Sequence, residues 1–222
     1  MLVHIPNVLD PATLAGVQGL LEALEWAPGS ATAGWHAREV KSNDQATPGA
    51  VLERVRGLVT AAVEKNEIVR AMALPRRVFP PLVSRSAAGQ GYGTHVDDAL
   101  IGGALALRSD VSVTVFLCEP ETYGGGELVV ETLAGEEGAK LKAGDAVLYP
   151  STTLHRVEPV THGLRLVAVT WIESIVRDAG RREILFDLDR ARRAVFQREG
   201  KSATFDLLAK SYSNLLRRWA KA

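Results

Sequence analysis

The chain has 222 residues, 46% of them apolar, and it carries 26 Lys and Arg residues against 26 Asp and Glu residues. This length suits one domain with a small appendage, and the balanced charge gives no indication of a nucleic-acid or anionic-membrane partner. The single cysteine, Cys118, excludes an internal disulfide framework and a cysteine-rich zinc site.

The first third of the chain is predicted to be mainly helical. Two helix-start signals, each a capping residue followed by proline, stand at Asp10-Pro11 and Thr47-Pro48. Apolar residues recur at helical spacing after each signal, which predicts helices over 11–25 and up to about residue 65. The Gly-, Ala- and Ser-rich segment 28–46 between them is expected to be a loop with a short strand.

From residue 80 the sequence changes to short β-branched segments separated by Gly and Asp turns. Six strands are predicted, at 81–86, 111–119, 126–132, 145–150, 155–160 and 165–173. The clearest turns are Gly124-Gly125-Gly126 and Ala143-Gly144-Asp145. So many strands in so short a stretch favour an antiparallel sandwich or jelly-roll-like barrel over parallel βαβ units.

After Glu173 the pattern returns to helix, with two apolar stripes over 184–195 and 205–219. We therefore expect a domain over 1–176, helical over 1–79 with a β core over 80–176, and a helical C-terminal subdomain over 177–222. The two tail helices could pack on the barrel or on a second subunit as a homodimer. No secretory signal and no bilayer-length apolar segment is visible, which predicts a cytoplasmic protein without a membrane partner.

The string Tyr92-Gly93-Thr94-His95-Val96-Asp97 carries the first indication of chemistry. Residues i and i+2 of a strand point to the same face, so His95 and Asp97 can present an imidazole and a carboxylate together. His155, on a later predicted strand, is the expected third ligand. Two histidines and one carboxylate form the facial triad of non-heme Fe(II) oxygenases, which leaves positions open for an oxoacid and O2.

Arg165 follows His155 by ten residues, and the segment between them is expected to form a hairpin with its turn at Thr161-His162-Gly163. Such a hairpin would return Arg165 beside His155. Its planar guanidinium could then bind the distal carboxylate of 2-oxoglutarate through two hydrogen bonds.

Several stretches resemble the PKHD-type (PiuC-like) hydroxylases, a bacterial group of prolyl 4-hydroxylase-like 2-oxoglutarate oxygenases. They are HVDDALI, FLCEPETYGGGELVVET, LKAGDAVLYPSTTLHRVEPVTHGLR and WIESIVRD, together with the tail elements LFDLDRA and YSNLLRRW. The resemblance implies a double-stranded β-helix core, Fe(II) on His95, Asp97 and His155, 2-oxoglutarate on Arg165, and L-ascorbate as an accessory reductant. It also implies hydroxylation linked to iron or siderophore uptake. One departure is Ser84-Arg85-Ser86, where the family usually carries Asn-Arg-Tyr.

Two alternatives remain beside the dioxygenase hypothesis: a non-catalytic iron-binding or iron-sensing module, and a zinc hydrolase with the same three ligands. A hydrolase would need a general base, and none is evident. The substrate is left open between a small molecule and a peptide. Three further histidines, His4, His36 and His162, are set aside as ligands, while Cys118 and Trp171 are interpreted as packing residues.

Overall fold

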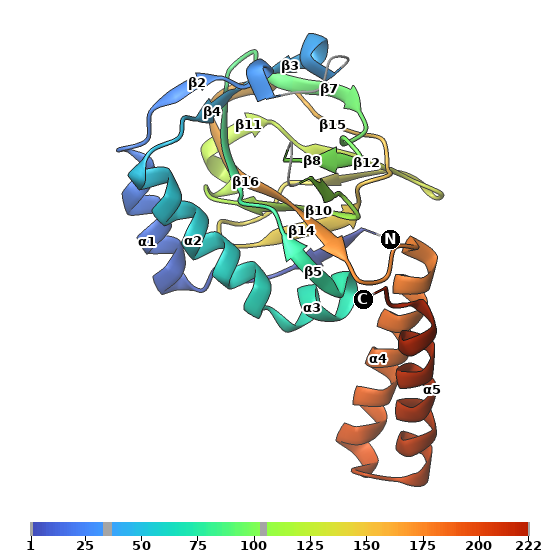
Figure 1. Ribbon diagram of the computed structural model, residues 1–222. Helices are drawn as coiled ribbons and strands as arrows, with labels where there is room; N and C mark the ends of the chain where they lie inside the picture. Colours follow the sequence, from blue (N-terminus) through green and yellow to red (C-terminus); the bar gives the residue numbers. More distant parts are fainter. Residues whose placement is uncertain (1, 33–36, 103–105, 222) are drawn as a thin grey trace.

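The computed structural model describes residues 2–32, 37–102 and 106–221. The helices of the N-terminal third pack against a β barrel, and the two helices at the C-terminus extend away from it (Figure 1). Within the described residues the helices are α1 (Pro11–Leu21), α2 (Ala50–Lys65), α3 (Glu67–Ala73), α4 (Ala179–Glu199) and α5 (Ala203–Trp219), with short 3-10 turns at Gly29–Thr32, Ala37–Val40 and Pro120–Thr122.

The barrel consists of two facing antiparallel sheets. The main sheet has the order β1-β14-β10-β16-β6-β4-β2, and β5 and β11 also pair with β16. Its strands are β1 (Val3–Ile5), β2 (Trp26–Pro28), β4 (Asp44–Ala46), β5 (Pro75–Val78), β6 (Leu82–Ala87), β10 (Val111–Phe116), β11 (Tyr123–Gly125), β14 (Ala146–Pro150) and β16 (Val160–Ser174).

The second sheet has the order β13-β12-β15-β7-β3, and a separate hairpin pairs β8 with β9. These strands are β3 (Lys41–Ser42), β7 (Gly91–His95), β12 (Leu128–Thr132), β13 (Gly135–Ala139), β15 (His155–Val157), β8 (Leu100–Ile101) and β9 (Leu107–Arg108). The all-antiparallel pairing and the two facing sheets agree with the predicted jelly-roll architecture.

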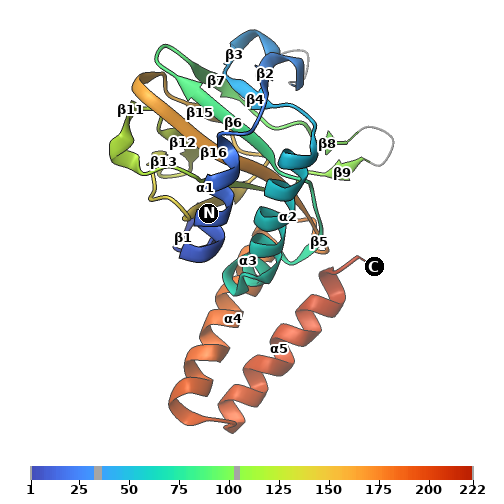
Figure 2. The ribbon, with the colours of Figure 1, turned by 90° about the vertical axis from the view of Figure 1, so that its left-hand side faces the viewer.

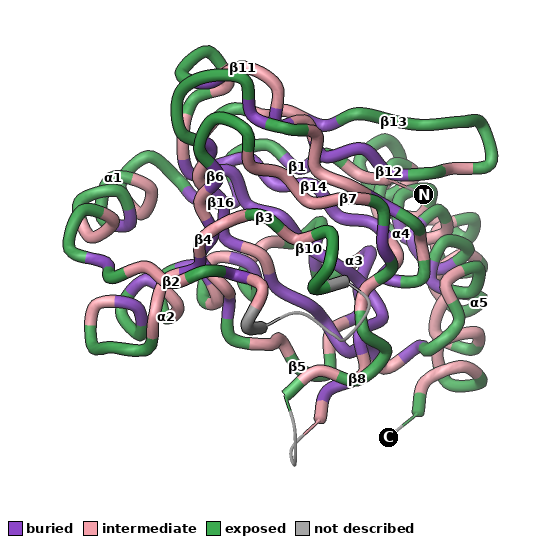
Figure 3. Tube along the Cα trace, turned by 90° about the horizontal axis from the view of Figure 1, so that it is seen from above, coloured by how far each residue is buried: buried purple, intermediate pink, exposed green. Residues whose placement is uncertain are grey.

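Alternate residues of a strand point to opposite faces of a sheet, and both faces of the main sheet are covered. The helices cover one face, and the second sheet covers the other. On β10, Val111, Val113 and Val115 belong to the cluster formed with the helices, whereas Phe116 packs with residues of the second sheet. Helices α1 and α2 cover the outer face (Figures 1 and 2). Figure 3 shows the buried residues concentrated along the central strands, with exposed residues on the outer turns. This layering leaves the inner face of the sheet free to line a cavity.

The N-terminal strand β1 pairs with β14 at one edge of the main sheet. His4 Nε2 lies 3.0 Å from Asp145 Oδ2, and the backbone N–H of Asn7 donates to the other oxygen of the same carboxylate at 2.9 Å. His4 is therefore part of a contact that closes the sheet, in agreement with its being set aside as a metal ligand.

Helices α4 and α5 form an antiparallel pair that projects from the barrel (Figures 1 and 2). At the base of the pair, Val176 and Leu185 are buried with Leu74, and four residues of α5 pack partly buried against them: Tyr212, Leu215, Leu216 and Trp219. No described residue of α5 is fully buried. None of the helices in the described part of the chain combines the length and apolar composition needed to span a bilayer.

Three sequence predictions differ from the structure. The first helix ends at Leu21 instead of residue 25, while the mainly helical N-terminal third also contains the short strands β1 to β5, in agreement with the expected fold class. Thr161-His162-Gly163 is not a turn, because β16 already begins at Val160 and pairs there with β11. Residues 155–165 are not a hairpin either, since β15 and β16 belong to different sheets.

Candidate metal and oxoacid site

His95 and His155 are directly opposite one another on neighbouring strands. β7 and β15 pair antiparallel with His155 in register with His95, and the centroids of the two rings are 4.2 Å apart. Each ring uses Nδ1 for a backbone carbonyl two residues earlier: His95 donates to Gly93 O at 2.8 Å and His155 to Thr153 O at 3.0 Å. A carbonyl only accepts, so both Nδ1 atoms carry the proton and both Nε2 atoms are left as electron-pair donors.

Asp97 does not lie on the same strand as His95, as the sequence analysis supposed. β7 ends at His95, and Asp97 follows in the connection to β8. Its carboxylate is held instead by the hydroxyl of Ser112, which donates to Asp97 Oδ2 at 2.5 Å. The other oxygen, Oδ1, is 3.7 Å from His155 Nε2. The Ser112 hydroxyl therefore orients the carboxylate towards the imidazoles, whereas the sequence analysis expected the alternation of side chains along one strand to do so.

One ligand atom from each of His95, Asp97 and His155 lies within 4.8 Å of the other two, and both histidines are buried. Burial first, followed by the charge of His155, lowers the pKa of His95 to about 4. A neutral imidazole is the form that binds a metal. Two nitrogens and one carboxylate oxygen on one side of a cavity fit a divalent transition metal with open coordination positions.

Arg165 enters the same cavity from the opposite sheet. It lies on β16, where it pairs across the strands with Ser86 of β6, and its side chain is almost fully buried over the ring of Phe116. Burial lowers its pKa, yet a guanidinium stays charged in proteins. Within the described residues no carboxylate forms an ion pair with it, and its Nε has no hydrogen-bond partner.

The surroundings of Arg165 leave space for an anionic group. The hydroxyl of the buried Tyr123 also lacks a hydrogen-bond partner. Gly126, with a φ of 69°, lies against both residues, because a Cβ there would be 2.9 Å from Arg165 Cδ and 3.0 Å from Tyr123 Cε2. A buried cation on the cavity wall, with no carboxylate partner among the described residues, fits the distal carboxylate of an oxoacid.

A cavity of about 360 Å³ joins the triad to Arg165. Its volume is typical of small-molecule sites. Several lining residues were not singled out from the sequence as site residues, and they comprise Lys41, Asn43, Gln45, Phe79, Leu82, Ile101 and Thr114. No local sequence pattern indicated them, because they come from separate segments of the chain that meet only in the folded protein.

Three further lining residues have chemistry relevant to a ligand. Tyr92 stacks on His95 with ring centroids 3.6 Å apart, and the Lys41 ammonium lies 5.3 Å from the Tyr92 centroid. Burial lowers the pKa of Lys41 to about 8, opposed by the charge of Asp97. Trp171, interpreted from the sequence as a packing residue, lines the cavity with its buried Nε1 unpartnered.

The remaining candidates lie outside the cavity or outside the described residues. His162 is exposed on β16, and His36 lies outside the described residues. Cys118, expected within a strand over 111–119, lies beyond the end of β10 and is half-buried, with its Sγ accepting from the backbone N–H of Leu166 at 3.2 Å. Burial raises the pKa of its thiol. Ser84 and Ser86 both line the cavity, so the departure from the family pattern falls on its wall.

Comparisons with known proteins agree with this geometry. The profile of the 2OG-Fe(II) oxygenase superfamily matches residues 81–173, and that of the PKHD-type hydroxylase C-terminal domain matches residues 179–221. A PKHD-type hydroxylase of Gloeothece citriformis is 48% identical over 221 residues, covering 100% of both chains. Another, from Synechococcus elongatus, is 48% identical over 223 residues with the same coverage.

Solved structures share the fold at low sequence identity. A Pseudomonas putida prolyl-4-hydroxylase superposes with a TM-score of 0.52 at 19% identity, over 78% of this chain and 92% of its own. The carbocyclase SnoK from nogalamycin biosynthesis superposes with a TM-score of 0.56 at 16% identity, over 79% and 80%. Because these two proteins differ in activity, the shared fold leaves the substrate open. The full-length similarity settles the family: the chain is a PKHD-type hydroxylase, a member of the 2OG-Fe(II) oxygenase superfamily, whose dioxygenases use Fe(II) and 2-oxoglutarate.

Proposed function

We propose that His95, Asp97 and His155 bind the Fe(II) of this dioxygenase and that Arg165 binds the distal carboxylate of 2-oxoglutarate. The observation that carries the proposal is the convergence of three ligand atoms within 4.8 Å in a cavity that also contains Arg165. The two Nε2 atoms and one carboxylate oxygen would be the ligands. The guanidinium would make charge-assisted hydrogen bonds to the oxoacid from the opposite sheet.

When bound, Fe(II) and 2-oxoglutarate activate O2, and 2-oxoglutarate becomes succinate and CO2 as the substrate is oxidised. The chain itself orients these groups and excludes water. The Nδ1 contacts hold both imidazoles in the ligating tautomer. Arg165 is fixed between Phe116 and the Ser86 strand, which sets the direction of the oxoacid.

The part of the cavity away from Arg165 is proposed as the substrate site. Phe79 and Trp171 form an edge-to-face pair there, with centroids 5.9 Å apart, and Leu82 lines the same wall. The unpartnered Trp171 N–H is available as a donor, because a buried donor without an acceptor is unfavourable until a ligand supplies one. The substrate stays open between a small molecule and a peptide.

Anaerobic titration with Fe(II) and 2-oxoglutarate tests the assignment, because the complex should show a visible charge-transfer band. Adding O2 should yield succinate. Arg165→Lys should weaken 2-oxoglutarate binding about 10-fold or more, since a lysine cannot make the two-point contact. Arg156→Lys is the matched control, because Arg156 pairs with Glu136 and Glu158 away from the cavity.

Two outcomes would contradict the proposal. A colourless protein that retains zinc and hydrolyses esters or amides would support the hydrolase alternative. A protein that binds Fe(II) but releases no succinate would support the iron-binding module. The roles of L-ascorbate and of iron or siderophore uptake stay predictions from the resemblance.

The C-terminal subdomain over 177–222, beside an oxygenase domain over 1–176, is proposed as the surface of a homodimer. Ile184, Phe196 and Leu207 are large apolar residues that stay exposed on α4 and α5. Light scattering at several concentrations should report a dimer, and Phe196→Asp should shift it towards monomer. A concentration-independent monomer would contradict the proposal.

A further inference from the structure

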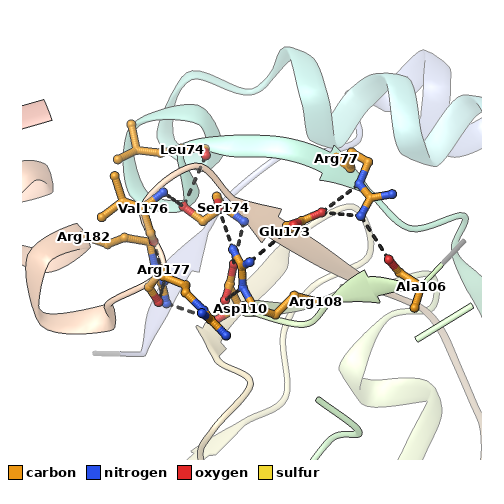
Figure 4. A network of polar contacts seen from close by, with 10 residues as sticks. All are labelled: Leu74, Arg77, Ala106, Arg108, Asp110, Glu173, Ser174, Val176, Arg177 and Arg182. Atoms are coloured by element: carbon orange, nitrogen blue, oxygen red, sulfur yellow. Dashed lines mark hydrogen bonds and ion pairs between the residues drawn. The ribbon is translucent and has the colours of Figure 1, made fainter. Parts of the chain in front are cut away.

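The helix pair is attached to the barrel by a buried arginine, Arg182 of α4. Its guanidinium donates to three backbone carbonyls: Val176 at 2.9 Å, Arg177 at 2.8 Å and Asp110 at 3.0 Å. Figure 4 shows the side chain inserted between the end of β16 and the start of β10. Only 5% of Arg182 is exposed, so this contact is an internal joint and not a surface ion pair.

Asp110, whose carbonyl oxygen accepts the Arg182 hydrogen bond, makes several further hydrogen bonds. Its carboxylate accepts two hydrogen bonds from Arg108, at 2.8 and 2.7 Å, and one from the backbone N–H of Ser174 at 2.8 Å. Its carbonyl oxygen accepts a second donor, the backbone N–H of Ser151, at 3.3 Å. The Asp110 carbonyl therefore joins α4 to the segment that carries Ser151.

From Ser151 the contacts continue to the metal-site carboxylate. Ser151 Oγ lies 2.8 Å from Ser112 Oγ, and Ser112 Oγ lies 2.5 Å from Asp97 Oδ2. An ionised carboxylate only accepts, so the Ser112 hydroxyl donates to Asp97 and accepts from the Ser151 hydroxyl. Both serines are buried, so water does not compete for these bonds.

Asp97 depends on this support because no strand holds it. It lies between the end of β7 and the start of β8, and Val96 and Asp98 on either side are exposed. A second contact restrains the same loop, since Ser109 Oγ donates to Asp98 O at 2.5 Å. Ser109 and Ser112 flank Asp110, so the segment that receives Arg182 also holds the loop that carries Asp97.

We propose that Arg182 is a positioning residue for the Asp97 carboxylate, acting through the Asp110 carbonyl, Ser151 and Ser112. The C-terminal helix pair thereby contributes to metal affinity although it lies outside the cavity. This inference rests on the proposed function, because it takes Asp97 as a metal ligand. With Oδ2 held by Ser112, Oδ1 stays turned towards His155 Nε2.

The test measures Mn(II) affinity by EPR on the full chain, without 2-oxoglutarate or substrate, so that turnover plays no part. Ser112→Ala should weaken Mn(II) binding about 10- to 100-fold, the usual effect of losing a hydrogen bond to a ligating group. Ser151→Ala and Arg182→Lys should weaken it several-fold. Arg192→Lys, on the same helix but paired with Asp189 of that helix, should leave it unchanged.

A double-mutant cycle separates coupling from general destabilisation. If the contacts act in sequence, Arg182→Lys should reduce Mn(II) affinity less when it is added to Ser112→Ala than when it is made in the wild-type protein. Additive losses, or an Arg182→Lys protein with lower thermal stability but wild-type Mn(II) affinity, would overturn the inference. If Arg182→Lys does not fold, the cycle of Ser151→Ala with Ser112→Ala decides in its place.

The two proposals fail in different ways. An Asp97→Ala protein that retains wild-type Mn(II) affinity would contradict the proposed ligand set. A wild-type protein that binds Mn(II) tightly, with Asp97→Ala impaired and the Arg182 and Ser151 variants unaffected, would overturn the positioning role alone.

Discussion

His95 and His155 are fixed in the cavity by the same local contact. In each, Nδ1 donates to the carbonyl two residues earlier in its own chain segment. The contact needs no distant partner, so each imidazole is oriented as soon as its segment adopts the native backbone. Asp97 and Arg165 differ, because both depend on residues far away in the sequence for their orientation.

Stability of the metal-free protein should depend on pH through His95. Its pKa is lowered from 6.5 to about 4 by burial and by His155. Between these values the unfolded chain binds more protons than the folded one, so the free energy of unfolding should fall as pH decreases from 6.5 towards 4. Urea denaturation across this range should show the fall, and His95→Gln should show a shallower one. Equal slopes in the two proteins would contradict the role of His95.

Arg165 should strengthen the binding of 2-oxoglutarate while lowering the thermal stability of the ligand-free protein. Arg165→Met replaces a buried cation by an apolar side chain of similar length. We expect the metal-free variant to unfold at the same temperature or a higher one, since no carboxylate among the described residues compensates the charge. Binding of 2-oxoglutarate should weaken about 100-fold or more. Calorimetry measures both effects, and a lower melting temperature with unchanged binding would be the opposite result.

At the scale of elements, the sequence predicted the strands that are apolar and missed those that are held by their neighbours. β10 and β14 are almost entirely buried and consist mainly of apolar residues, so their pattern is strong. β13 reads Gly135–Ala139, GEEGA, which has low strand propensity and exists because it pairs with β12. The two strands form a tight hairpin in which Thr132 pairs with Gly135, but the segment of β13 lacks the apolar pattern by which the other strands were predicted.

The roles proposed for the site residues stay predictions, but the structure shows how these residues come together. His95, Asp97, His155 and Arg165 do meet in one cavity. Strand alternation and a hairpin were the expected routes, whereas the structure uses the Ser112 contact for Asp97 and the opposite sheet for Arg165. Pro159 lies in the short connection through which the chain leaves β15 for the other sheet. Nothing in the spacing distinguishes such a crossing from a tight turn.

The glycines of β7 should be required by close packing. A Cβ at Gly91 would be 2.9 Å from Val157 O, and one at Gly93 would be 2.9 Å from Val40 Cβ. Alanine at either position should lower the free energy of unfolding by about 1–3 kcal/mol. Gly57→Ala in α2, where the new Cβ meets open space, should instead raise it by about 0.5–1 kcal/mol. Denaturant titrations of the three variants compare these values, and equal effects would contradict the packing argument.

At the scale of the whole molecule, the described contacts of the helix pair with the rest of the chain lie at its base and along α4, where Phe186 joins the core cluster and Arg193 lies 3.5 Å from Glu67 of α3. At the base the Leu74, Val176 and Leu185 cluster meets residues of α5, while Phe196 and Phe205 at the far end contact each other with centroids 5.0 Å apart. Contacts at the base of the pair are therefore expected to contribute to the stability of the barrel, whereas contacts at the tip are not.

Deletion of residues 201–222 removes α5 and exposes the buried cluster at the base. We expect a melting temperature lower by roughly 6–12 °C, from a loss of about 3 kcal/mol of apolar burial. Differential scanning calorimetry gives the shift. Phe205→Ser at the tip is the control and should change the melting temperature much less. A larger effect at the tip would contradict this division.

The edge strand β1 has a consequence for solubility. Val3–Ile5 occupies the outer hydrogen-bonding side of β14, whose residues 146–149 are all buried. Without these three residues, the backbone N–H and C=O groups of β14 would be open to a strand from another molecule. A shortened chain should therefore form concentration-dependent aggregates, which dynamic light scattering would detect. The first strand, although it contributes no residue to the proposed metal site, thus determines whether the sheet ends within one molecule or continues into the next.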